Sequence, residues 1–206
     1  LGVKLVHEKS NHWQADNVST RFQNYFFSGY WQSPRYFEAT WDLMKDDFII
    51  NEFRNRQVLD LSKRINDSNS LAIGIRNYKE TKNVLLYARN GKVKHCLDWK
   101  KQIERLQDEL ANPQIYIFGT QISLQQISQM GIKGKNYKIV PYSDFKDPVD
   151  SMFLFSSARH HMFNNSTFFW WGSFLRKLYF EAKDQKVYAA DNFLNLDCLP
   201  NYWKTW

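Results

Sequence analysis

"HHMFNNSTFFWWGSFLRKLYF", the stretch from His160 to Phe180, changes character in its middle. Its first residues read as a short strand that ends in two asparagines, and the residues after Ser166 repeat aromatic side chains at helical spacing. A helix start leaves backbone N–H groups unpaired and carries partial positive charge, so a junction with added hydroxyls suits a phosphate. The alternative is ordinary capping, in which the polar side chains satisfy only the backbone of the helix itself.

Strand and helix patterns alternate from about Ser70 to the end of the chain, with short connections between them. Asp147 is placed to cap a helix that begins at Pro148, and Gly131 is placed to end the helix before it. This alternation predicts an α/β fold in which a parallel, Rossmann-like sheet carries helices on both faces. The predicted strands cover residues 70–76, 114–120, 137–142, 160–165 and 186–191, and the predicted helices cover residues 97–113, 121–131, 147–159 and 166–180.

The first third of the chain follows a different pattern. Residues 1–32 are irregular and rich in aromatics, with a short strand expected near Tyr25–Ser28. The stretch "SPRYFEATWDLMKDDF" predicts a helix with Ser33 as its N-cap and Pro34 at its first position. A second helix is predicted over residues 51–67.

The composition limits the classes of partner. A formal net charge of +7 over 206 residues favours nucleotide phosphates, nucleic acid or an anionic membrane surface, although a solvated basic surface is the alternative. Cys96 and Cys198 lie far apart without a CxxC pattern, which argues against a disulfide framework or a zinc site and fits a reducing compartment. No apolar run approaches the roughly 18 residues that span a bilayer, and no basic-then-apolar leader is visible.

Polar or small residues follow several of the predicted strands, where ligands bind in a parallel sheet. Arg76 comes after a run of apolar and small residues, and a guanidinium can bind two phosphate oxygens at once. A salt bridge to Glu80 is the alternative reading of this arginine. Gly119, at the end of the next strand, allows a ligand to approach the backbone closely. Together with the junction at Ser166 these strand ends suggest a nucleotide, although GxGxxG, GxxxxGK[ST] and DxD patterns are absent here.

The block "NNSTFFWWGSFL" (residues 164–175) is similar to the "ANSTFSWWGAWL" block of the alpha-1,2-fucosyltransferases. "SGYWQSPRYFE" (residues 28–38) resembles the "GYFQSEKYF" block of that family, and "LFSSARHHMFNNST" (residues 154–167) resembles "LMSxCxHxIIANST". "LAIGIRNYKE" stands where the family carries "HxRRxD", "IYIFGTQIS" stands where it has "FFVFSDD", and "LPNYWK" resembles its terminal Pro-x-x-Trp. The blocks occur in the family's order across nearly the whole chain, and the block over residues 164–175 is the most specific of them.

The chain also departs from the family pattern. Gly74 replaces the motif histidine, Asn77 replaces the second motif arginine, and the motif aspartate has no clear counterpart. The "SDD" triplet is replaced by residues 119–121, Gly-Thr-Gln, and the family's early "GGxGNQ" loop is absent. We therefore expect the chain to lack about the first third of a full enzyme, or to be a divergent member with another donor or acceptor.

The resemblance implies the C-terminal half of a GT-B-like fold, with residues 1–69 as the remainder of an acceptor-side region with linking helices and residues 70–206 as the nucleotide-sugar-binding domain. It implies a metal-independent glycosyltransferase without cofactor or metal site that transfers fucose from GDP-fucose to a galactoside hydroxyl in alpha-1,2 linkage. Arg76 matches the first motif arginine and is the implied catalytic residue, because the departing diphosphate gains negative charge. The residues implied to bind the nucleotide sugar are Arg76, Phe118, Gly119, Thr120, Ser156, His160, Asn165, Ser166 and Thr167.

Several of these roles have alternatives. Asn165 is expected to orient the Ser-Thr turn, and His160 is expected either to contact the ribose or base or to pack in the core. Trp170 and Trp171 are expected to belong to the core. An oxocarbenium-like transition state needs little deprotonation of the acceptor, so a general base is not required. The sequence does not choose among the candidate bases Asp98, Glu80 and His12.

Two rival functions fit the same sequence. The missing motif residues favour a nucleotide-binding protein that has lost catalysis, and the positive charge with many aromatics suggests a nucleic-acid binder. Against the latter, the aromatics lie on helical core faces instead of alternating with basic residues on a strand.

The expected partners are a GDP-sugar donor, an oligosaccharide or glycolipid acceptor and an anionic membrane at the periphery, without nucleic acid. The expected location is the cytoplasmic face of the inner membrane for a bacterial chain, which is preferred, and the Golgi lumen for a eukaryotic one.

Overall fold

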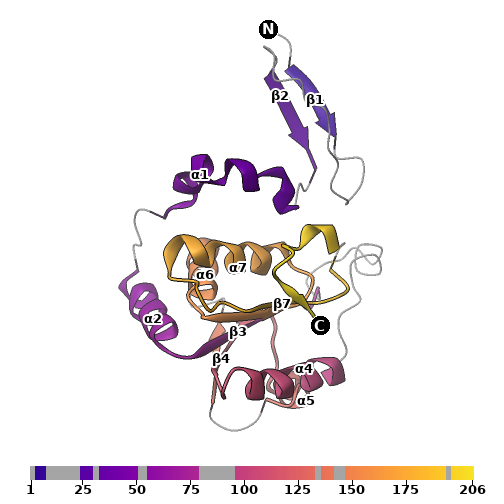
Figure 1. The fold of residues 1–206 in the computed structure, drawn as a ribbon. Coiled ribbons are helices and arrows are strands. Elements are labelled where there is room, and N and C mark those ends of the chain that lie inside the picture. Colours follow the sequence, from indigo (N-terminus) through magenta and orange to yellow (C-terminus); the bar gives the residue numbers. More distant parts are fainter. Residues whose placement is uncertain are drawn as a thin grey trace.

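The core of the protein is a six-stranded, all-parallel sheet with the strand order β5-β4-β3-β6-β7-β8 (Figure 1). The computed structural model describes residues 3–7, 24–29, 33–50, 55–78, 96–132, 136–141, 147–193 and 196–206. The strands of this sheet are β3 (Ser70–Ile75), β4 (Gln114–Gly119), β5 (Tyr137–Pro141), β6 (His160–Phe163), β7 (Val187–Ala189) and β8 (Lys204–Thr205).

Numbered from β3, the strand order is 3-2-1-4-5-6, which is the order of the dinucleotide-binding Rossmann fold. The chain leaves β3 in one direction to build β4 and β5 and returns on the other side to build β6, β7 and β8. The order therefore reverses between β3 and β6, and ligands of such folds bind beyond the carboxyl ends of the strands at this point. The Rossmann-like α/β fold predicted from the sequence is confirmed.

Helices cover both faces of the sheet and bury two separate cores. In Figure 1, α4 and α5 lie below the sheet and α6 and α7 lie above it. Side chains of β3 alternate between the two cores, because Leu71 and Ile73 pack with α4 and α5 while Ala72 packs with α6 and α7. The helices are α2 (Arg56–Asp67), α4 (Cys96–Glu109), α5 (Leu124–Gln129), α6 (Pro148–Ser156) and α7 (Thr167–Tyr179).

The helix boundaries follow the local signals. The side chain of Asp147 accepts a hydrogen bond from the backbone N–H of Val149 at 2.9 Å, and Pro148 occupies the first position of α6. Gly131 follows α5 with a φ of +76°, the left-handed conformation that ends many helices. The predicted roles of these residues are confirmed. Helix α2, which precedes the predicted boundary at residue 70, packs on α6.

The single helix predicted over residues 33–48 is wrong. The segment forms 3₁₀ turns at residues 34–36, 38–40 and 45–48 around one α-turn, α1 (Trp41–Met44), and Ser33 makes no side-chain cap bond. Tertiary packing overrides the helical pattern here. Phe37 lies 5.5 Å from both Trp171 and Phe174 between ring centroids, so the backbone bends to place its aromatic rings against α7.

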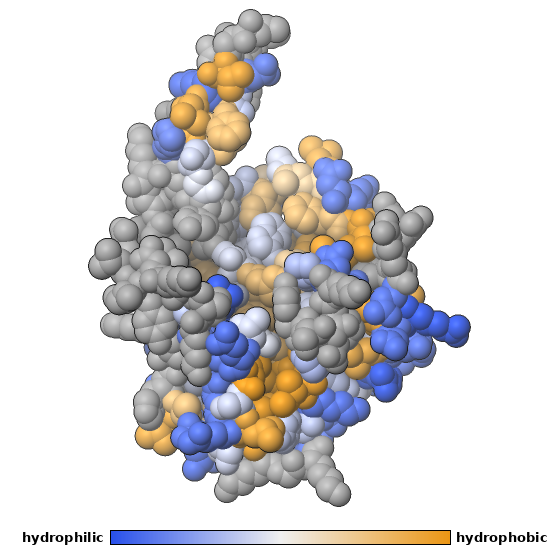
Figure 2. All heavy atoms as spheres, turned by 180° about the vertical axis from the view of Figure 1, so that it is seen from behind, coloured by the Kyte–Doolittle hydropathy of each residue, from blue (hydrophilic) through white to orange (hydrophobic). Residues whose placement is uncertain are grey.

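Two strands were not predicted. β1 (Val3–His7) pairs in parallel with β2 (Asn24–Ser28), which covers the expected short strand, and this pair projects from the rest of the molecule in Figure 1. Its apolar side chains are exposed, and Figure 2 shows them as orange patches on the arm at the top of the view. The two-residue strand β8 is too short to leave a periodic signal. No helix in the described part of the chain is long and apolar enough to cross a membrane.

His160 and His161 open β6 in buried, neutral form. Nδ1 of His160 accepts the backbone N–H of Lys186 at 3.2 Å, and Nε2 of His161 lies 2.9 Å from the carbonyl oxygen of Phe155. Burial, together with the nearby charge of Arg159, lowers the pKa of His160 to about 4. Burial alone is the main reason that the pKa of His161 falls to about 3.

We expect the free energy of unfolding to fall as the pH drops from about 7 toward 4. In the unfolded chain both imidazoles titrate near their ordinary pKa of about 6.5, so below that pH the unfolded state binds protons that the folded state excludes. Urea unfolding across this pH range, followed by tryptophan fluorescence, measures the loss. The variant His160→Gln keeps an acceptor but does not titrate, so its stability should fall less. An equal fall in the two proteins would contradict the assignment.

We expect Gly74→Ala to destabilise the fold by about 1–3 kcal/mol through overpacking. A methyl carbon on Gly74 would lie 2.4 Å from Cγ of Phe169, whose ring comes from α7 and lies against the middle of the sheet. Denaturant unfolding of Gly74→Ala, Phe169→Leu and the double variant tests this contact. Because the smaller side chain frees space, the double variant should be more stable than the sum of the two single effects. Strict additivity would show that the two residues do not compete for space.

Candidate functional site

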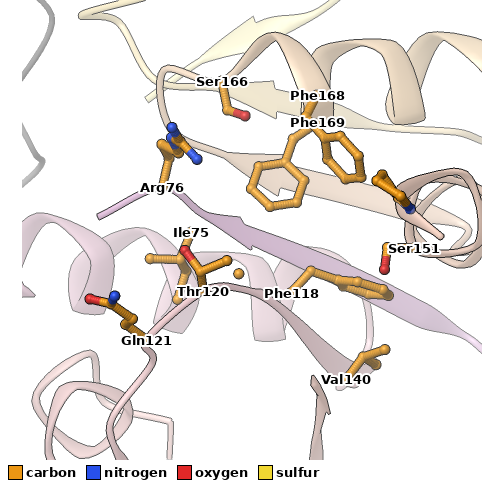
Figure 3. A pocket seen from close by; sticks show the side chains of 12 residues that line it. Ile75, Arg76, Phe118, Thr120, Gln121, Val140, Ser151, Ser166, Phe168 and Phe169 are labelled. Atoms are coloured by element: carbon orange, nitrogen blue, oxygen red, sulfur yellow. The ribbon is translucent and has the colours of Figure 1, made fainter. Parts of the chain in front are cut away.

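A cavity of about 370 Å³ opens at the carboxyl ends of β3 and β4, below the start of α7. This volume lies in the range of small-molecule sites. Figure 3 shows Arg76, Ser166, Thr120 and Gln121 toward one end, and Phe118, Val140 and Ser151 toward the other. The cavity is thus polar at one end and mainly apolar at the other. Its walls are formed by Ile75, Arg76, Phe118, Gly119, Thr120, Gln121, Val140, Pro148, Ser151, Ser166, Phe168 and Phe169.

Five of the nine predicted site residues line this cavity. They come from three separate places in the chain, namely the end of β3, the end of β4 and the residue before α7. The structure therefore brings together strand ends that the sequence analysis could connect only by the rule that parallel strands place their carboxyl ends on one edge. The five residues are Arg76, Phe118, Gly119, Thr120 and Ser166.

Asn164, directly after β6, fixes the backbone of Arg76. Its Oδ1 accepts the backbone N–H of Arg76 at 2.7 Å, and its Nδ2 donates to the backbone carbonyl of Arg76 at 2.8 Å. The asparagine is 2% exposed, so both bonds are protected from water. They join the two central strands at the point where the strand order reverses. The orienting role was predicted for Asn165, although an asparagine at the end of a buried strand was a signal for Asn164.

The two residues after Arg76 hold the same segment on both sides, Asn77 toward α5 and Tyr78 toward the turn after β6. Asn77 is buried and exchanges two amide hydrogen bonds with Gln126, at 2.9 and 3.2 Å. Tyr78 donates its hydroxyl proton to the carbonyl of Asn165, and the guanidinium carbon of Arg76 lies 5.2 Å from the centre of the Tyr78 ring. The backbone that carries Arg76 is therefore fastened to both halves of the sheet, which limits the positions its side chain can reach.

Ser166 is the N-cap residue of α7, but its side chain makes no capping hydrogen bond. An N-cap hydroxyl ordinarily accepts from the second or third N–H of the helix, which here belong to Phe168 and Phe169, and both residues line the cavity. The N–H groups of the first helical turn have no acceptor within the helix. The ordinary capping alternative for this junction therefore does not hold for Ser166, and the helix start presents donors and partial positive charge beside Arg76.

Gly119 has a φ of +153°, a conformation that only glycine adopts easily. A side chain at this position would place its Cβ 2.4 Å from the backbone carbonyl oxygen of Ile75. The glycine was expected to admit a ligand to the backbone. The structure shows a second reason for it, because β3 and β4 approach each other too closely here for any side chain.

Four predicted site residues do not line the cavity. Ser156 is fully buried, and its hydroxyl donates to the carbonyl of Phe153 at 2.7 Å. His160 lies at the amino end of the central strand β6, whereas the cavity lies at the carboxyl ends of the strands, and it packs in the interior, which was its alternative role. Asn165 takes part through its backbone carbonyl, and Thr167 is exposed at the first position of α7.

The two tryptophans of α7 belong to the core, and Asp98 lies away from the cavity lining. Trp170 is buried and donates its ring N–H to the carbonyl of Cys198 at 2.7 Å, and Trp171 packs on the same aromatic core, as expected. Asp98 lies exposed in the first turn of α4, the simple helix-start position. The candidate bases Glu80 and His12 lie outside the described residues.

Comparison with known proteins gives one informative relative. The chain is 26% identical over 152 residues to an alpha-1,2-colitosyltransferase from Escherichia coli, a match that covers 73% of this chain and 51% of that protein. The chain thus spans about half the length of this relative. No family model matches the chain, and no solved structure is significantly similar to it. The similarity is to a glycosyltransferase, and the more particular resemblance to the fucosyltransferases stays a prediction.

We expect Asn164→Ala to destabilise the protein by about 1–3 kcal/mol, because it leaves the buried backbone N–H and carbonyl of Arg76 without partners. Chemical denaturation measures this change. The matched variant Asn164→Asp keeps an acceptor for the N–H but sets a buried carboxylate against the carbonyl oxygen, so it should be destabilised at neutral pH and recover part of its stability at acidic pH, where the protonated carboxyl can donate. Unchanged stability in both variants would show that the two hydrogen bonds do not hold this segment.

Proposed function

We propose that this chain carries the nucleotide-sugar site of a glycosyltransferase. The similarity to a colitosyltransferase supports the reaction class, and the Rossmann-like sheet with a cavity at its switch point supports a nucleotide as ligand. For the donor we propose GDP-fucose, with transfer to a galactoside hydroxyl in alpha-1,2 linkage, because the "NNSTFFWWG" block resembles that family. Colitose, from the name of the relative, is the alternative donor sugar.

The observation that carries this proposal is the pairing of Arg76 with the start of α7 on one cavity. Both line the same cavity, and the hydroxyl of Ser166 is not used to cap its own helix. A guanidinium, a hydroxyl and the N-terminal N–H groups of a helix can hold a diphosphate without a metal ion bound by side-chain carboxylates.

The proposed chemistry follows from where charge develops. As the bond between sugar and diphosphate breaks, negative charge grows on the leaving oxygen and the adjacent phosphate. Arg76 would meet this charge from the end of β3, and Ser166 with the first N–H groups of α7 would meet it from the end of β6. The hydrogen bonds from Asn164 hold the Arg76 backbone in place before the ligand arrives, so little reorganisation is needed during the reaction.

A nucleotide-sugar-binding protein without catalysis is the second candidate. Asn77 stands in place of the second motif arginine, and its amide is occupied by Gln126, so it adds no positive charge to the cavity. This loss leaves one arginine where the family pattern has two. Binding of GDP without any transfer would favour this second candidate. The nucleic-acid alternative receives less support, because Trp170, Phe174 and their neighbours are buried in the core.

The partners and location belong to the same proposal. The donor is a GDP-sugar, and the acceptor is an oligosaccharide or glycolipid. A bacterial chain would act at the cytoplasmic face of the inner membrane, where its positive charge would favour contact with anionic lipid. The proposed reaction uses neither cofactor nor metal ion.

We expect Arg76→Ala to lower the rate of transfer about a hundredfold, which corresponds to the loss of one preorganised charge-stabilising donor of about 3 kcal/mol. Arg76→Lys should be nearly as impaired, because an ammonium cannot replace the two-pronged contact of a guanidinium. Calorimetric titration with GDP and a transfer assay with GDP-fucose and GDP-colitose measure binding and turnover separately. Thermal unfolding checks that both variants remain folded.

The same assays contain the outcomes that count against the proposal. Turnover at the wild-type rate in both arginine variants would contradict the proposed contact between Arg76 and the phosphates. The transfer assay is also run with EDTA, followed by added magnesium or manganese. Loss of transfer in EDTA with recovery on metal addition would contradict the metal-independent mechanism.

A further inference from the structure

The apolar end of the cavity contains one polar side chain that has no partner. Ser151 lies on the first turns of α6 and is 4% exposed, and its Oγ makes no hydrogen bond within the described part of the chain. Phe118 and Val140 line the cavity beside it, and Figure 3 shows the three side chains together at the end away from Arg76. Buried hydroxyls are nearly always paired, so this one needs an explanation.

The serines at the two ends of α6 differ in their hydrogen bonds. A helical serine often bonds to the carbonyl three or four residues before it. The hydroxyl of Ser151 makes no such bond. Ser156 and Ser157, later on the same helix, both donate to the carbonyl of Phe153, at 2.7 and 2.9 Å. Ser151 is thus the buried serine of α6 whose hydroxyl remains for another partner.

The polarity of the cavity suggests what that partner is. A nucleoside diphosphate with its phosphates at Arg76 and Ser166 would extend its base toward the apolar end, where Phe118 offers a ring face. The polar atoms of a nucleobase lie along its edge and lose water when the base enters an apolar cavity, so they need a hydrogen-bond partner there. Among the described side chains at this end of the cavity, the hydroxyl of Ser151 is such a partner.

We propose that Ser151 is the residue that reads the nucleobase, through a hydrogen bond between its Oγ and the base edge. This inference rests on the proposed nucleotide site and adds a specificity residue to it. A hydroxyl can both donate and accept, whereas a carboxylate only accepts. Because a hydroxyl pairs with donors and acceptors alike, it favours a ligand that has a base over one that has none, by the order of tenfold for a single neutral hydrogen bond.

The test compares a ligand that has a base with one that does not. GDP contains both the base and the diphosphate, whereas inorganic pyrophosphate contains only the diphosphate. We expect Ser151→Ala to weaken GDP binding about three- to tenfold, the value of one neutral hydrogen bond, and to leave pyrophosphate binding unchanged. Competition against a fluorescent GDP derivative measures both affinities. Thermal unfolding of the ligand-free protein should show equal or higher stability in Ser151→Ala, because an unpaired buried hydroxyl has been removed.

Ser157→Ala is the matched control. Ser157 is a buried serine at the other end of the same helix, and its hydroxyl also lies 2.8 Å from that of Ser62. Its loss should lower thermal stability and leave GDP affinity unchanged, the reverse of the effect at Ser151.

The possible results separate the two proposals. If wild-type protein binds neither GDP nor pyrophosphate, the proposed function fails. If wild type binds GDP and Ser151→Ala binds it equally well, the role of Ser151 is overturned and the nucleotide site stands. If Ser151→Ala weakens GDP and pyrophosphate by the same factor, the effect acts through the fold and the role of Ser151 is overturned as well.

Discussion

The pair of hydrogen bonds between Asn164 and the backbone of Arg76 is the constraint on which the site depends. The ends of β3 and β6 belong to the two halves of the sheet, and a parallel ladder alone leaves the residues beyond each strand without partners. One buried amide satisfies both backbone groups of Arg76 and, through its own position, fixes the turn that starts α7. The arginine side chain and the start of the helix are therefore placed by the same residue.

Aromatic packing on α7 supports this arrangement from behind. The ring of Phe169 lies against Gly74. It uses the room that the missing side chain of the glycine leaves. Further along α7, Trp170 and Phe174 stack at 5.1 Å between ring centroids and anchor the helix in the core. The polar start of the helix consequently sits on a rigid support.

The sequence predicted the elements whose signals are local. The strands and helices after Ser70 follow hydrophobic periodicity, and the end of α5 and the start of α6 follow residues with specific backbone roles, Gly131 and Asp147. The segment over residues 33–48 was mispredicted because its aromatic spacing serves contacts with α7 and not a helix of its own. Strand β8 was missed because two residues carry no period.

The site was predictable only in part, for the same reason. Arg76, Gly119 and Ser166 stand at strand ends, which a pattern can locate. The partner of Asn164 lies 88 residues away in the sequence, and the hydroxyl of Ser151 has no partner among the described residues. Neither feature can be predicted from the residues next to it. His160 was predicted as a ligand because it matched a motif position, whereas its buried neutral ring packs in the interior at the amino end of β6.

The separation of 88 residues between Arg76 and Asn164 has a consequence for how the protein matures. On the ribosome, β3 emerges long before β6. β3 can therefore pair with β4 early, but it cannot pair with β6 until that strand has been synthesised. Closing so long a loop costs conformational entropy and favours slow folding. The binding site therefore cannot be completed before residue 164 has emerged, and a chain interrupted before that residue lacks the partner for the backbone of Arg76.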